Sequence, residues 1–202
     1  MKLYYVPGAC SLASHIMLHE VGANFHIESV DTKAGVTDSG RNYIDINANG
    51  YVPTLETDTG EILVEGVAIL QYLADTNAEH AYAPALGTIE RARLQQFLNY
   101  AAAELHKSWG PLFNDATTDA ERAAAKDKVK GKLSYLESVL SDGRDYLVDN
   151  TFSVSDAYTF VMAYWANYKD IDLATWPHLS RYVDRIAGRP SAQAAFKAEG
   201  LA

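Results

Sequence analysis

The sequence has 202 residues, 48% of them hydrophobic, and a formal net charge of −9 at pH 7. This length allows one large domain or two small ones, and the hydrophobic share suffices for a core without disulfides or metals. The acidic charge argues against nucleic acid as a main partner. No apolar run approaches the ~20 residues of a membrane span, and the N-terminus lacks a signal-peptide pattern. Because a single cysteine suits a reducing compartment, we expect a cytoplasmic protein that does not bind membranes.

The only cysteine, Cys10, lies between a predicted strand over residues 2–6 and a predicted helix that begins at Ser11. Pro7-Gly8 ends the strand. The free amides and the positive dipole end of a helix N-terminus favour a thiolate. The alternative is a small buried residue, which is what free cysteine more often is. Since no second thiol is present, redox or conjugation chemistry at Cys10 requires a small-molecule thiol.

The rest of the first third of the chain predicts further strands and one helix. Strands are expected over residues 25–30 and 52–56, and Asp58-Thr59-Gly60 predicts a hairpin turn to a strand over 61–64. A helix follows over residues 66–76. This order predicts a mixed sheet with helices packed on it, that is, an α/β domain over residues 1–76.

The remainder of the chain predicts helices only. Residues 77–87 lack periodicity and are interpreted as a linker, which leaves residues 88–202 as an all-α domain. Ser153 followed three positions later by Asp156 is close to a capping box. Gly188 and Pro190 are expected to stop the last predicted helix. The expected helices span residues 88–113 and 119–140, and two more begin at Ser153 and Pro177.

Three local patterns then stand out: MKLYYVPGACSL over residues 1–12, NANGYVPTL over 47–55 and EGVAILQYL over 65–73. With the ELHK sequence at 104–107 behind them, the chain resembles the glutathione S-transferase family over its whole length, closest to the bacterial beta class. The resemblance implies a thioredoxin-like domain followed by an all-helical domain. It also implies glutathione as co-substrate, no metal, and a homodimer.

In this family the proline after the third-strand turn is cis, so the resemblance implies a cis Val52–Pro53 bond, against the alternative of a plain strand start. The Val52 amide and carbonyl would then pair with the cysteinyl part of glutathione like an added strand. Glu65 would accept the ammonium of the γ-glutamyl end, and the Gly66 amide its carboxylate. The alternative for Glu65 is a residue that only caps its helix.

His106 resembles the beta-class histidine near the glutathione sulfur, where it would donate to a thiolate or accept the thiol proton. Asn99, seven residues earlier on the predicted helix, nearly eclipses it. Glu104 lies on the opposite side of the helix and is expected to reach the partner subunit. Lys33 is the nearest cation to Gly35, where the class carries a lysine that helps to hold the glycyl carboxylate. Asn99, Glu104 and Lys33 are therefore counted among the expected glutathione-binding residues. The remaining histidines show no metal-ligand spacing.

The hydrophobic co-substrate is expected in the helical domain, beside aromatic residues that are more often core than pocket. The candidates are Trp109, Phe113, Tyr164 and Trp165.

The predicted function is conjugation of the glutathione thiolate to hydrophobic electrophiles, with Cys10 and His106 stabilising the sulfur anion. Cys10 is itself a thiol, so glutathione-dependent thiol-disulfide exchange or peroxide reduction is a second predicted activity. Two alternatives stay open. One is a non-catalytic module that keeps the fold as a binding scaffold. The other is a specialised reaction such as glutathione-dependent dehalogenation.

Overall fold

A computed structural model of the chain describes residues 1–77, 82–148 and 150–201. It has two compact units, Met1–Ala83 with Gly188–Ala202, and Pro84–Ala187, here called the N-terminal unit and the helical unit. The predicted linker over 77–87 falls partly on residues 78–81, which lie outside the described residues. Within the described ranges, no helix is long and apolar enough to cross a membrane.

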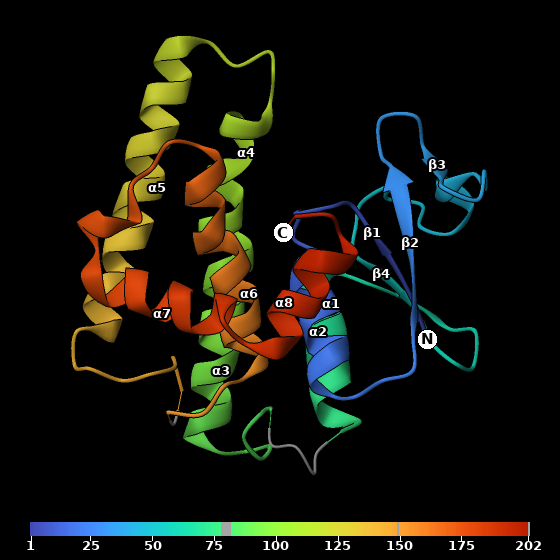
Figure 1. Ribbon diagram of the computed structural model, residues 1–202, viewed down its shortest axis with the longest axis horizontal. Coiled ribbons are helices and arrows are strands. Elements are labelled where there is room, and N and C mark those ends of the chain that lie inside the picture. Colours follow the sequence, from blue (N-terminus) through green and yellow to red (C-terminus); the bar gives the residue numbers. More distant parts are fainter. Residues whose placement is uncertain (78–81, 149, 202) are drawn as a thin grey trace. The chain divides into compact units, whose positions relative to one another are not determined.

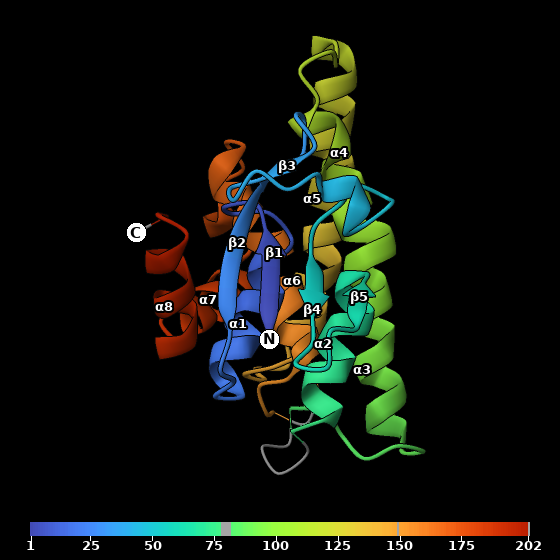
Figure 2. The same ribbon diagram turned by 90° about the vertical axis from the view of Figure 1, so that its right-hand side faces the viewer.

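A five-stranded mixed sheet forms the N-terminal unit, in the order β3-β2-β1-β4-β5. Strand β1 pairs in parallel with β2 and antiparallel with β4, and the remaining pairs are antiparallel. Figure 2 shows β2, β1 and β4 running side by side. The predicted strands are confirmed, and only the two-residue β3 had no sequence signal. The strands are β1 (Lys2–Tyr5), β2 (His26–Asp31), β3 (Val36–Thr37), β4 (Thr54–Glu56) and β5 (Ile62–Val64).

Two of the helices that cover this sheet were predicted, namely α1 (Leu12–Glu20) and α2 (Gly66–Asp75). A further helix of this unit, α8 (Pro190–Ala198), packs against α1 (Figure 1). The predicted helical domain includes residues 188–202, but this segment belongs to the N-terminal unit. Pro190, which is predicted to end a helix, instead starts α8. Proline suits a first helical position, because its missing N–H would have no helical acceptor there.

In the helical unit, apolar stripes at helical spacing make the core, as predicted. The stripe residues of the first predicted helix, from Leu94 to Trp109, are at most 5% exposed, and those of the second are at most 1% exposed. The longest single α-helix described in this unit is α5 (Asp119–Leu140), drawn in yellow in Figure 1. The other elements are α3 (Ile89–Asn99), η3 (Tyr100–His106), α4 (Lys107–Phe113), α6 (Val154–Tyr164), η4 (Trp165–Tyr168), η5 (Leu173–Thr175) and α7 (Pro177–Ala187).

The predicted helix over residues 88–113 is continuous but not uniform, because η3 is a π-helix that ends at His106. A π-helix forms i→i+5 bonds and is found mostly as short insertions at functional sites. Its wider turn changes the angle between residues seven apart. The eclipsing of Asn99 and His106 assumed α-helical spacing, which does not hold here.

Two of the helices in this unit begin with capping boxes. The box at Ser153 and Asp156 was predicted, and the Asp156 carboxylate accepts bonds from the Ser153 amide and hydroxyl. It also accepts from the Leu147 amide and the Tyr182 hydroxyl, all of them buried. These four donors hold the start of α6, the helix that carries Tyr158.

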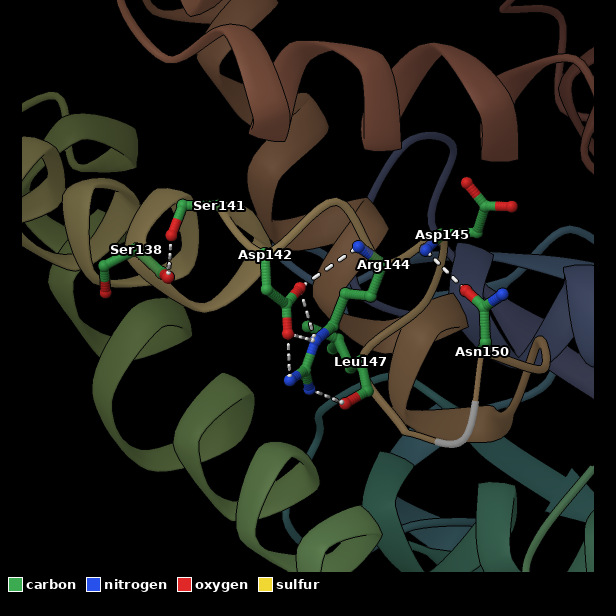
Figure 3. Close-up of polar contacts among 7 residues, drawn as sticks. All are labelled: Ser138, Ser141, Asp142, Arg144, Asp145, Leu147 and Asn150. Carbon is green, nitrogen blue, oxygen red and sulfur yellow. Dashed lines mark hydrogen bonds and ion pairs between the residues drawn. The ribbon is translucent and has the colours of Figure 1, made fainter.

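The loop between α5 and α6 is held by its own polar contacts (Figure 3). The Arg144 guanidinium donates to both carboxylate oxygens of Asp142 and to the Leu147 carbonyl. The Asp145 amide donates to the Asn150 side-chain oxygen at 2.6 Å. These hydrogen bonds join residues of the loop to one another, and they hold the segment that precedes the capped start of α6.

Candidate functional site

Cys10 lies in the turn between β1 and α1, at the end of the strand as predicted. The Cys10 side chain is half-buried, and its thiol donates to the Val52 carbonyl at 3.3 Å. Ser11 is the N-cap of α1, but its hydroxyl bonds to Val6 rather than to the helix. The turn thus places the thiol against the segment that leads into β4.

Burial raises the pKa of the Cys10 thiol to about 11, although the backbone amides of Cys10 and Ser11 act in the opposite direction. The expectation that the helix start favours a thiolate is therefore wrong for this structure. Burial penalises a charged sulfur more than two amides stabilise it. Cys10 is a neutral thiol at pH 7, and a neutral thiol can donate a hydrogen bond.

The Val52–Pro53 peptide is cis, which confirms the prediction. The preceding residue, Tyr51, is held by two hydrogen bonds to its carbonyl. The Tyr43 hydroxyl donates to it at 2.8 Å and the side-chain amide of Asn47 at 2.7 Å. The Val52 amide donates to no acceptor within the described part of the chain. Val52 therefore offers an open main-chain donor beside the carbonyl that the thiol occupies.

Glu65 and Gly66 stand where β5 gives way to α2, as predicted. Glu65 has a left-handed backbone with φ of 68°, and its exposed side chain makes no cap bond to the helix. The capping interpretation of Glu65 therefore fails. The first amides of α2 have no intrahelical acceptors, as at any helix start. A carboxylate and free amides thus lie together at the start of α2.

The Cys10 turn is supported by Glu199, a residue that the sequence did not single out. One Glu199 oxygen accepts from the Gly8 amide at 2.8 Å, and the other lies 2.8 Å from His15 Nδ1. The side chains of His15 and Glu199 are 1% and 0% exposed. Glu199 follows α8, which explains why that helix belongs to the N-terminal unit. Its separation of 191 residues from Gly8 left no sequence signal.

His106 ends η3 in the helical unit, and its ring is half-buried. Its Nδ1 lies 3.1 Å from the Tyr158 hydroxyl, and its ring packs edge-on against Trp165 with centroids 5.1 Å apart. Burial, with a smaller effect of Lys107, lowers the pKa of His106 to about 4. The imidazole is therefore neutral at pH 7, with one ring nitrogen a donor and the other an acceptor. Tyr158 was not predicted, since only the fold brings α6 against η3.

The four aromatic candidates divide by burial. Trp109 is fully buried and Trp165 is 5% exposed, whereas Phe113 is 47% exposed and Tyr164 is half-buried. Phe113 packs edge-on against Trp165 with centroids 4.9 Å apart. The core interpretation therefore fits Trp109. His106, Trp165 and Phe113 form a connected row that ends on an exposed ring.

The remaining candidates contact their own neighbours. The Asn99 amide donates to the Gln95 carbonyl at 2.8 Å, and Glu104 forms an ion pair with Lys132 of α5 in the same chain. Lys33 is exposed in the loop after β2. Among the described residues, no group of three or more acidic, histidine or cysteine side chains is placed to hold a metal ion.

Comparison with known proteins identifies both parts of the chain. The sequence model of the glutathione S-transferase N-terminal domain matches residues 1–75, and that of the C-terminal domain matches residues 100–190. The chain is 39% identical to glutathione S-transferase GstA of Escherichia coli O157:H7 over 201 residues, covering 100% of both chains.

Solved structures agree with this match. A sphingomonad glutathione S-transferase complexed with glutathione is 46% identical, with a TM-score of 0.95 over 100% of both chains. The bacterial beta-class enzyme of Sphingomonas chungbukensis is 44% identical, with a TM-score of 0.96 over 100% of both chains. The chain therefore belongs to the glutathione S-transferase family, with its likeness to the bacterial beta class, and is a transferase that uses glutathione as co-substrate.

Proposed function

We propose that the protein joins the sulfur of glutathione to hydrophobic electrophiles, with the peptide of glutathione paired to Val52. The observation that carries this proposal is the contact of the Cys10 thiol with the Val52 carbonyl, beside a Val52 amide that donates to no described acceptor. A bound cysteinyl residue that pairs with this amide and carbonyl places its own sulfur near the Cys10 thiol, which then turns from the carbonyl to the sulfur.

The two ends of glutathione are assigned to charged and main-chain groups. The exposed Glu65 carboxylate takes the ammonium of the γ-glutamyl end, and the Gly66 amide takes its carboxylate. Lys33 takes the glycyl carboxylate, in a loop with no lysine at position 35. Asn99 and Glu104 complete the set that the resemblance implies, and Glu104 does so only by leaving Lys132.

At the sulfur, Cys10 and His106 act as neutral groups. A thiol with a pKa of about 11 donates a hydrogen bond to the glutathione thiolate without adding a second negative charge. When Tyr158 donates to His106 Nδ1, Nε2 carries the proton and donates to the same sulfur. Two neutral donors stabilise an anion in a site where a second anion would repel it.

The electrophile is assigned to the exposed end of the aromatic row, with Phe113 as the contact residue and Trp165 behind it. Tyr164, whose ring packs against Phe160 and Tyr168, is a further candidate contact. Trp109, fully buried, supports Trp165 with centroids 6.2 Å apart and forms the wall of the site rather than its surface. In this assignment residues 1–76 bind most of glutathione and residues 84–187 supply the hydrophobic site.

Thiol-disulfide exchange through Cys10 is proposed as the slower activity. In that reaction the Cys10 thiolate attacks the glutathione sulfur of a mixed disulfide between glutathione and another thiol compound, and that compound leaves as its thiolate. A second glutathione then attacks the Cys10–glutathione disulfide, which frees Cys10 and forms oxidised glutathione. The attacking species is the thiolate, which is scarce at pH 7 for a thiol with a pKa of about 11. Conjugation therefore dominates near neutral pH.

We propose a cytoplasmic homodimer. The single cysteine suits a reducing compartment. A groove of about 1230 Å³ runs along η3, α4 and α5 and is lined by Tyr100, Lys107 and Tyr135 among others, which makes this face the first to test for subunit contact. Light scattering should give twice the chain mass of 22.2 kDa. The chain mass itself would contradict the dimer.

The test is conjugation of glutathione to chlorodinitrobenzene, with glutathione binding followed by calorimetry. The native protein should bind glutathione and turn over, and Cys10→Ala should lose exchange activity with a mixed disulfide of glutathione and another thiol completely. Conjugation that survives intact in Cys10→Ala would remove Cys10 from the sulfur site. Absence of both binding and turnover in the native protein would favour the non-catalytic scaffold.

A further inference from the structure

The exposed end of the aromatic row carries a cation. Lys169, which follows η4, places its ammonium 4.0 Å from the centre of the Phe113 ring. Phe113 is 47% exposed, so its ring is open to a ligand. The Lys169 side chain is half-buried, which limits its choice of positions.

The ammonium is not neutralised within the described part of the chain. Within that part Lys169 makes no ion pair and no hydrogen bond through its ammonium, which contacts the Phe113 ring. A cation over an exposed ring gains only about 0.5–1 kcal/mol, and an ammonium has three donors, which this contact does not use. In a chain with a net charge of −9, Lys169 gives this aromatic surface a local positive charge.

We propose that Lys169 selects aromatic electrophiles that carry an anionic substituent such as a carboxylate. This inference rests on the proposed placement of the electrophile beside Phe113. An aromatic ring that packs against Phe113 brings a ring substituent within reach of the ammonium, which lies on the same ring. The neighbouring Trp165 supplies an apolar wall, so the lysine is the group that discriminates charge.

The reaction itself does not change. The glutathione thiolate attacks the ring carbon that bears the halogen, a carbon–sulfur bond forms, and the carbon–halogen bond breaks as halide leaves with its electron pair. The thiol proton passes to solvent. Lys169 takes no part in these bonds, and its charge acts on binding of the substituent.

The test compares 4-chloro-3,5-dinitrobenzoate with the matching neutral amide, 4-chloro-3,5-dinitrobenzamide. For each variant, the ratio of kcat/KM for the benzoate to that for the amide cancels general losses of activity. Lys169→Met should lower this ratio about tenfold, the scale of one partly exposed charge-assisted hydrogen bond. Lys169→Arg should keep the ratio within about twofold because the charge remains. Removal of an exposed lysine elsewhere, Lys197→Met, should leave it unchanged.

A binding experiment separates this inference from the proposed function. Tryptophan fluorescence follows binding of the unreactive 3,5-dinitrobenzoate and 3,5-dinitrobenzamide in the presence of S-methylglutathione. If the native protein prefers the benzoate and Lys169→Met loses this preference, the inference is supported even if no conjugation occurs. Absence of conjugation would then count only against the proposed function. Equal affinity for the two ligands in the native protein, or an unchanged preference in Lys169→Met, would overturn it whether or not conjugation occurs.

Discussion

The N-terminal unit and the helical unit contribute different kinds of groups to the proposed site. In the N-terminal unit, the peptide of glutathione is assigned mainly to main-chain groups, namely the Val52 amide and carbonyl and the amide at Gly66. In the helical unit, the electrophile is assigned to side chains, with Phe113 half-exposed and Trp165 behind it. A main-chain amide or carbonyl is still present after most substitutions at its own position, whereas each substitution of an aromatic residue changes the surface that contacts the electrophile. We infer that glutathione binding tolerates sequence change and that the choice of electrophile does not.

The two titratable groups of the proposed site also differ, although burial acts on both. It raises the pKa of the Cys10 thiol to about 11 and lowers that of His106 to about 4. Burial disfavours whichever form is charged, so an acid and a base shift in opposite directions and both become neutral. This is why the site can be described by hydrogen-bond donors rather than by fixed charges.

The largest expected effect is at Glu199, which supports the Cys10 turn in the N-terminal unit. Glu199→Ala removes the acceptor of the Gly8 amide and leaves His15 buried without its carboxylate partner. The free energy of unfolding should fall by about 3 kcal/mol, as for the loss of one partner in a buried pair. Urea unfolding measures this, with the exposed Lys197→Ala as control. Equal stability of the two variants would show that the turn does not depend on Glu199.

The next effect is the pH dependence of stability that arises from His106 in the helical unit. The pKa of His106 lies below its unfolded value of about 6.5, so its contribution to stability is fully present above pH 6.5 and is lost as the pH falls towards 4. His106→Phe should therefore lose less stability than the native protein over this interval, by up to about 2 kcal/mol after allowance for partial exposure. Urea unfolding at pH 7 and pH 4.5 checks the difference. Parallel losses in both proteins, with the exposed His26→Gln as a third curve, would contradict it.

A smaller effect is expected at the charged end of glutathione. Glu65→Gln should raise the KM for glutathione about tenfold and leave kcat within about twofold, because the carboxylate binds the ammonium and does not touch the sulfur. Steady-state conjugation kinetics measure both values, and Glu61→Gln on the same hairpin is the control. A change in kcat alone would place Glu65 in the chemical step instead.

The smallest effect is expected at Tyr51, whose side chain is 73% exposed while its carbonyl is held by Tyr43 and Asn47. Tyr51→Gln keeps these main-chain bonds. Stability should change by less than about 0.5 kcal/mol, and the KM for glutathione by less than about threefold. A loss of tenfold or more in a binding assay would show that the side chain, and not the main chain, binds glutathione at this position.

Local patterns predicted most of the fold and only part of the site. Short apolar runs bounded by turn residues located the strands, and helical apolar spacing located the buried stripes. Ser153 with Asp156 marked the start of α6. The π-helix before His106 left no signal, because Ala101, Leu105 and Trp109 follow a spacing that an α-helix would also show.

Contacts and pKa values at the site depend on packing that sequence spacing does not contain. Glu199 reaches Gly8 across 191 residues, and Tyr158 reaches His106 across 52. The thiolate expected at Cys10 came from the helix start alone, whereas the structure adds a burial that outweighs it. Local structure was therefore predicted better than the long-range contacts and the pKa values of the site residues.

The central claim is that Cys10 is a neutral donor at pH 7. Because it is the only cysteine, alkylation by iodoacetamide followed by mass spectrometry reports on it alone. The alkylation rate of the free protein should rise about tenfold per pH unit from pH 7 to 10, with no plateau before the pKa of about 11, while circular dichroism shows that the fold persists. A rate that levels off below about pH 8.5 would show a thiolate at neutral pH and contradict the claim.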